Sequence, residues 1–93
     1  MKSIEQGDLV ISKAGRDKGE IFLVVSIESD YVLIVNGRSR KVLTPKKKNE
    51  KHLRRVTTVS YKELAEKIRK GDAVGNERVY RLLKAEKQKI QED

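Results

Sequence analysis

The sequence contains no cysteine, no tryptophan, one proline and few aromatic residues, namely one phenylalanine and three tyrosines. Without cysteine, the chain can form neither a disulfide framework nor a thiolate metal site. So few aromatic rings argue against a platform that binds single-stranded nucleic acid by stacking its bases. The longest run of apolar character, residues 21–27, is far shorter than the about 20 residues that a membrane-spanning helix needs. These absences exclude disulfide-rich scaffolds, thiolate zinc modules and helical membrane proteins.

Residues suited to catalysis are also scarce. The only histidine is His52, no serine lies in a Gly-x-Ser-x-Gly setting, and the carboxylates are scattered among lysines and arginines. A single histidine without a cluster of carboxylates is a poor metal site. We therefore predict that the protein is not an enzyme and needs no metal or cofactor. His52 is expected to be a polar residue at the edge of a strand, or a contact that stacks on a base or donates to a phosphate.

Positive charge is abundant. Lysine and arginine number 22 against 14 aspartates and glutamates, which gives a net charge of +8 at pH 7. A small chain with this charge is expected to associate with polyanions, nucleic acid first and an anionic membrane surface as the weaker alternative. The N-terminal residues lack the apolar stretch of a signal peptide, so we expect a cytoplasmic protein. A chain of 93 residues is expected to form a domain with a thin core.

The first part of the chain is rich in Ile, Val and Leu and predicts a mainly β fold. Gly15 and Gly19 favour a tight loop, and Asn36-Gly37 between apolar runs is a strong signal for a two-residue hairpin. Short strands in succession, with no room for crossover helices, favour an antiparallel meander that closes into a small SH3-like barrel. The expected strands are Leu9–Ile11, Glu20–Ile27, Tyr31–Val35, Ser39–Leu43 and Leu53–Val59.

From residue 60 the apolar residues follow a helical period. Ser60 and Glu63 fit a capping box, in which each side chain binds a free backbone N–H of the other. An apolar face then runs through Tyr61, Leu64, Ala65 and Ile68. Gly71, after two basic residues, is a typical end for this helix. The chain is therefore expected to divide into a barrel of residues 1–59 and a helical extension of residues 60–93.

A second helix is expected from about Glu77 to Gln91, capped by Gly75-Asn76. Its apolar stripe consists of Val79, Leu82, Leu83 and Ile90. Three interpretations of the helical pair stay open. The helices pack together or cover the open end of the barrel, they form a hairpin that binds a protein partner, or they form a helix-turn-helix that reads DNA. No long apolar stripe is left over, so a monomer is expected.

The densest feature of the sequence is the segment from Arg38 to Arg55. It holds nine lysines and arginines against one acidic residue, Glu50, and so carries a net charge of +8. Such a run attracts phosphates, because each neutralised phosphate releases counterions. The loop around Gly15 and Gly19 adds further cations and lets a backbone approach closely. The candidate RNA-binding residues are Lys13, Arg16, Lys18, Arg38, Arg40, Lys41, Lys46, Lys47, Lys48, Lys51, His52 and Arg54.

Several of these segments together resemble a known family. Residues 7–10, the loop Ala14–Gly19 and Phe22–Val25 look like a KOW motif, a loop that joins two strands of an SH3-like barrel. Such motifs occur in ribosomal proteins and in NusG-type transcription elongation factors. Residues 31–38 and the run from Pro45 to Leu53 add a resemblance to the fourteen-e class of large-subunit ribosomal proteins, and in particular to its short bacterial KOW relatives. The resemblance covers about residues 4–56.

The resemblance implies that the loop at 15–19 and the basic strand-loop meet ribosomal RNA. The first hypothesis is thus a protein that binds RNA of the large ribosomal subunit, as a ribosomal-protein-like component or as a translation or assembly factor. The alternative is a KOW protein-interaction module that acts in transcription elongation. Residues 60–93 lie outside this resemblance, so a permanent component and a visiting factor both stay open, and this segment is a candidate for binding a protein partner.

Overall fold

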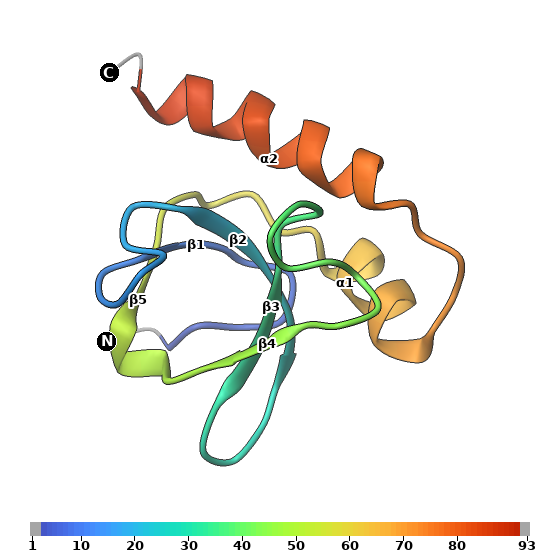
Figure 1. The fold of residues 1–93 in the computed structure, drawn as a ribbon, viewed down its shortest axis with the longest axis horizontal. Helices are drawn as coiled ribbons and strands as arrows, with labels where there is room; N and C mark the ends of the chain where they lie inside the picture. The colour runs from blue at the N-terminus through green and yellow to red at the C-terminus, as the bar shows by residue number, and fades with distance from the viewer. Residues whose placement is uncertain (1–2, 92–93) are drawn as a thin grey trace.

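The computed structural model describes residues 3–91, which form five antiparallel strands followed by two α-helices (Figure 1). In the sheet the strands lie in the order β4-β3-β2-β1-β5, and a short 3₁₀ helix, Glu50–His52, joins the two edge strands. The predicted mainly β class with a C-terminal helical pair is confirmed, and the arrangement is consistent with a small barrel. The elements are β1 Leu9–Ser12, β2 Ile21–Ile27, β3 Val32–Val35, β4 Lys46–Lys48, β5 Leu53–Arg55, α1 Lys62–Lys70 and α2 Asn76–Gln91.

Strand β2 is buried on both faces, which explains its continuous apolar sequence. Side chains alternate between the two faces of a strand. Phe22 and Val24 point into one apolar cluster, which also contains residues of β1, β3 and β5. Ile21, Leu23 and Val25 point into a second cluster on the other face. A strand that packs on one side only would alternate apolar and polar residues.

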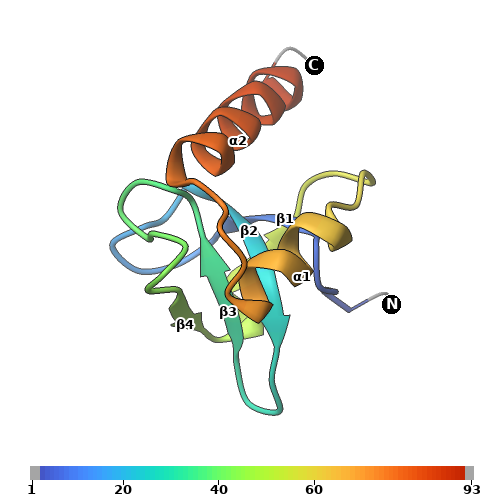
Figure 2. The same ribbon diagram turned by 90° about the vertical axis from the view of Figure 1, so that its right-hand side faces the viewer.

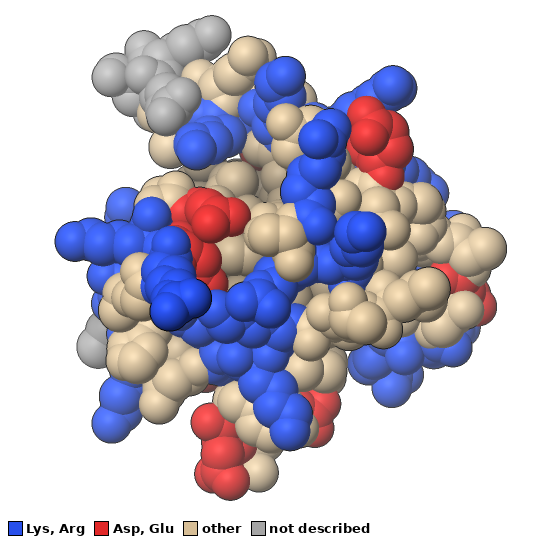
Figure 3. All heavy atoms as spheres, in the orientation of Figure 1, with Lys and Arg blue, Asp and Glu red and all other residues tan. Residues whose placement is uncertain are grey.

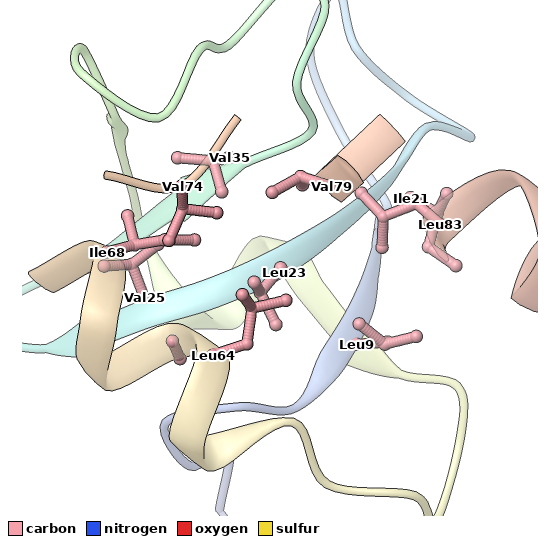
Figure 4. Close-up of a cluster of buried hydrophobic side chains, with 11 residues drawn as sticks. Leu9, Ile21, Leu23, Val25, Val35, Leu64, Ile68, Val74, Val79 and Leu83 are labelled. Carbon is pink, nitrogen blue, oxygen red and sulfur yellow. The ribbon is translucent and has the colours of Figure 1, made fainter. Parts of the chain in front are cut away.

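The second cluster is completed by the helical segment (Figure 4). Leu64, Ala65 and Ile68 come from α1, Val74 comes from the connection, and Val79 and Leu83 come from α2. In Figure 2 both helices lie on the same side of β2. The helices therefore cover a face of the sheet, and their apolar residues are buried in the core of the chain itself. Their packing role is the interpretation that the structure favours.

The start of α1 differs from the prediction. The N-cap residue is Tyr61 and no side chain caps the helix, so the expected capping box between Ser60 and Glu63 is wrong. Tertiary contacts fix this end instead, because the Tyr61 N–H donates to the Gly7 carbonyl over 2.8 Å and the Tyr61 hydroxyl donates to Glu86 over 3.0 Å. The predicted end of the helix is confirmed, since Gly71 has a left-handed φ of 86°.

The segment 36–45 is a loop, so the predicted strand Ser39–Leu43 and the two-residue hairpin are both wrong. The Asn36 side chain accepts from the N–H groups of Arg38 and Arg40, which folds the backbone into a local turn. Further on, the Val42 N–H donates to the side chain of Asn76 at the start of α2, over 2.8 Å. Lys46–Lys48, expected as a basic loop, form β4 in its place, and β5 ends at Arg55 rather than Val59.

Candidate nucleic-acid interface

The loop 13–19 between β1 and β2 lies at the centre of the basic segments. It is closed by a hydrogen bond from the Gly19 N–H to the Ser12 carbonyl, 2.9 Å long. The Lys13 N–H donates to the His52 carbonyl over 2.8 Å, so the loop adjoins the segment before β5. The side chain of Lys46 reaches Asp17 in the same loop. Three stretches that are distant in the sequence are thereby held side by side.

Asp17 is the anchor of this loop. Its carboxylate is buried and accepts from Ser12 Oγ at 2.7 Å, from Lys48 Nζ at 2.9 Å and from Lys46 Nζ at 2.8 Å. Lys48 Nζ also donates to the Ala14 carbonyl over 3.0 Å. Burial alone would raise the pKa of Asp17, but the hydrogen bonds from Lys46, Ser12 and Lys48 outweigh it and hold that pKa well below its usual range. We call this group the Asp17 clamp.

The clamp follows from the register of β4. Lys46 and Lys48 pair with Ile34 and Val32, whose side chains are buried in the apolar cluster that contains Phe22 and Val24. Directly paired residues share a face of the sheet, so these two lysines point inward and Lys47 points outward. Lys48 is only 8% exposed, and it cannot present its charge to a phosphate. The expectation that all three lysines form a contact surface is therefore corrected, and only Lys47 is exposed.

The other predicted RNA-binding residues reach the surface. We call them, with Lys47, the basic surface, and in Figure 3 lysines and arginines gather on the face that carries the loop 36–45 and β4. Some acidic side chains cover the turn between β2 and β3 at the bottom of the view, and others lie beside the cations under α2 and at the upper right. Lys47 Nζ lies 4.9 Å from the centre of the Tyr31 ring. The exposed members are Lys13, Arg16, Lys18, Arg38, Arg40, Lys41, Lys47, Lys51, His52 and Arg54.

The predicted RNA-binding residues include none from α2, which nevertheless contributes to this face. Arg38 stacks on Tyr80, with 3.8 Å between the guanidinium carbon and the ring centre, and approaches Glu77 at 3.8 Å. Lys84 lies on the same side of the helix, with Nζ 6.0 Å from the Tyr80 ring centre. The spacing of Tyr80, Lys84 and Lys87, at i, i+4 and i+7, is the signal that could have revealed this polar face.

Comparison of the sequence with protein-family models and with curated proteins finds no match. Over residues 3–91, no helix has the length and apolar character needed to cross a membrane. In the same part of the chain, no three histidine, aspartate or glutamate side chains gather where they could hold a metal ion. The described site therefore presents exposed cations that are held in fixed positions.

Proposed function

We propose that this protein binds structured RNA through the basic surface, and that its target is ribosomal RNA of the large subunit. It would act in the cytoplasm as a ribosomal-protein-like component or as a translation or assembly factor. One observation carries the RNA-binding proposal. Three separate segments that carry exposed cations, namely loop 13–19, β4 and the stretch before β5, are held side by side, and the Asp17 clamp fixes the loop from within. The ribosomal target is supported by the sequence resemblance of residues 4–56.

The proposed mechanism is binding alone. Exposed lysines and arginines neutralise phosphates, and the release of condensed counterions favours the complex. Arginines such as Arg16 and Arg40 can bind a phosphate with two hydrogen bonds, which fixes orientation as well as charge. The major groove of an RNA duplex is too narrow for side chains, so recognition depends on the shape of the backbone. A rigid loop with small residues such as Gly15 suits this task.

The test is a titration of a labelled RNA hairpin, followed by fluorescence anisotropy at several salt concentrations. The variant Arg40→Glu/Lys41→Glu/Lys47→Glu removes three exposed cations that take no part in the Asp17 clamp. Removing one cation that neutralises a phosphate lowers the slope of log affinity against log salt by about 0.7–0.9, so we expect a decrease of about 2–3. Affinity at low salt should fall by roughly 100-fold.

A control variant with the same net charge as the first variant shows whether binding depends on the position of the cations or only on the total charge. Lys62→Glu/Lys67→Glu/Lys70→Glu changes three exposed lysines of α1, away from loop 13–19. This control should keep most of the wild-type affinity and slope. Equal losses in the two variants would show that only net charge matters. Failure of the wild-type protein to bind the hairpin at low salt would overturn the proposal.

A second candidate function has one observation in its favour. Leu43 is 85% exposed within the basic loop 36–45, which suits an apolar contact with another protein. A protein-interaction module of transcription elongation would use such a contact. In that case Leu43→Ser should abolish binding to RNA polymerase, whereas the triple charge reversal should leave it intact. In the hairpin assay the pattern should be the opposite. Leu43→Ser should leave RNA binding intact, and the triple charge reversal should weaken it.

A further inference from the structure

A groove separates α2 from the barrel on the side of the loop 36–45. Its volume is about 490 Å³, within the range of pockets that hold small ligands, and Figure 3 shows a hollow under the helix. Ile21 and the ring of Tyr80 form part of its wall. Its charged lining residues are Glu20, Arg38, Lys84 and Lys87.

The cations of this groove are available to a ligand. Lys84 and Lys87 are three residues apart on α2, so both project from one side of the helix. Within residues 3–91, neither lysine has a carboxylate within 4.0 Å. Arg38 keeps 59% of its side chain exposed although it stacks on Tyr80 and approaches Glu77 at 3.8 Å. Two free ammonium groups beside a guanidinium suit the phosphates on either side of one nucleotide.

Glu20 gives the groove a hydrogen-bond acceptor. Its Oε1 accepts from Asn36 at 3.3 Å and from Ser39 at 3.4 Å, which orients the carboxylate. In the described residues its Oε2 receives no hydrogen bond. A carboxylate repels a phosphate, but it accepts well from a hydroxyl group. The ribose 2′-hydroxyl is the donor that distinguishes RNA from DNA.

We infer that this groove binds one unpaired ribonucleotide, with Glu20 accepting from the ribose 2′-hydroxyl and Lys84 and Lys87 binding the adjacent phosphates. The inference rests on the proposed RNA binding and adds to it a groove between α2 and the barrel, in which Glu20 senses the sugar. A loop nucleotide would occupy the groove while the neighbouring duplex lies on the basic surface. The protein would then favour RNA with unpaired nucleotides next to a stem.

The experiment compares two hairpins with the same RNA stem. One has a ribonucleotide loop, and the other has 2′-deoxynucleotides in the loop only, so contacts between the stem and the basic surface are unchanged. Wild-type protein should bind the all-RNA hairpin about tenfold more tightly, as expected for one hydrogen bond to a charged group. Glu20→Ala should abolish this preference. Thermal unfolding of Glu20→Ala checks that the fold stays intact without the hydrogen bonds from Asn36 and Ser39.

Lys84→Ala/Lys87→Ala provides a second arm that leaves Glu20 in place. It should weaken binding of both hairpins severalfold and retain the preference for ribose, whereas the matched control Lys62→Ala/Lys67→Ala should change neither. If wild type binds both hairpins equally, or Glu20→Ala retains the preference, the groove inference is wrong and RNA binding stands. Equal weakening of both hairpins by Glu20→Ala would also overturn it, since the effect of Glu20 would then not depend on the 2′-hydroxyl. If wild type binds neither hairpin, the proposed function fails.

Discussion

Replacing Asp17 with asparagine should destabilise the protein by about 3–5 kcal/mol, the range found when one partner of a buried ion pair is removed. The change leaves Lys48, which is 8% exposed, with a buried charge and no carboxylate. Chemical denaturation with urea measures the decrease. Asp30→Asn is the matched control, because Asp30 is exposed at the turn between β2 and β3, and it should change the free energy of unfolding very little. A cost below about 1 kcal/mol for Asp17→Asn, typical of an exposed pair, would contradict the clamp.

The same clamp predicts how stability depends on pH. The pKa of Asp17 is lower in the folded protein than its ordinary value of 3.8, so the folded state binds fewer protons than the unfolded state. Its contribution to stability is complete above that ordinary value and is lost as the pH falls toward the lower folded value. Wild-type stability should therefore decrease steeply below about pH 4. Asp17→Asn should show a shallower decrease in urea unfolding at pH 2–5.

Glu66 contributes to the same acid-sensitive region in both proteins. A hydrogen bond from Arg69 and another from Gln6 lower the pKa of Glu66 to about 2. Because Glu66 is unchanged in Asp17→Asn, the difference between the two pH profiles isolates Asp17. Identical profiles below pH 4 would show that Asp17 is not the group that links folding to protonation.

The second large effect is expected at Gly37. Its φ is +79°, and a Cβ added there would collide with the Asn76 carbonyl and lie 2.9 Å from the Tyr80 amide nitrogen. Gly19 has a φ of +90° but no atom within 4 Å of such a Cβ. Both alanine variants share the backbone strain, so Gly37→Ala should cost about 1–3 kcal/mol more, the usual penalty for overpacking. Urea denaturation of both variants gives this difference.

The additional destabilisation of Gly37→Ala over Gly19→Ala should be localised at the start of α2. Hydrogen exchange of the α2 amides should become faster in Gly37→Ala and stay at the wild-type rate in Gly19→Ala. Equal costs in the two variants would mean that the loop 36–45 and the helix separate easily. The groove would then have no fixed wall.

Periodicity and turn residues predicted most of the fold. The run Ile21–Ile27 predicted β2, and the spacing of Leu64, Ala65 and Ile68 predicted the buried face of α1. The strand expected at Ser39–Leu43 failed because its backbone N–H groups are taken by Asn36 nearby and by Asn76, which lies 34 residues further on. A contact at that separation leaves no local signal in the sequence.

The candidate site was predicted in outline. The concentration of charge between Arg38 and Arg55 located the basic surface, because charge follows directly from residue type. Which lysine of β4 faces inward depends on pairing with β3, and that register became visible only in the structure. Asp17 could therefore not be recognised as the partner of Lys46 and Lys48. The groove also needs the docking of α2, which brings Lys84 and Arg38 to the lining of one groove.

The most direct test of the central claim is sedimentation of the tagged protein from its native host through a density gradient. At low salt we predict that it comigrates with the large ribosomal subunit, and that Arg40→Glu/Lys41→Glu/Lys47→Glu remains at the top. Lys62→Glu/Lys67→Glu/Lys70→Glu should comigrate like the wild type. Retention at high salt would identify an integral component, and release would identify a visiting factor. Wild-type protein that stays at the top of the gradient at low salt would contradict the ribosomal proposal.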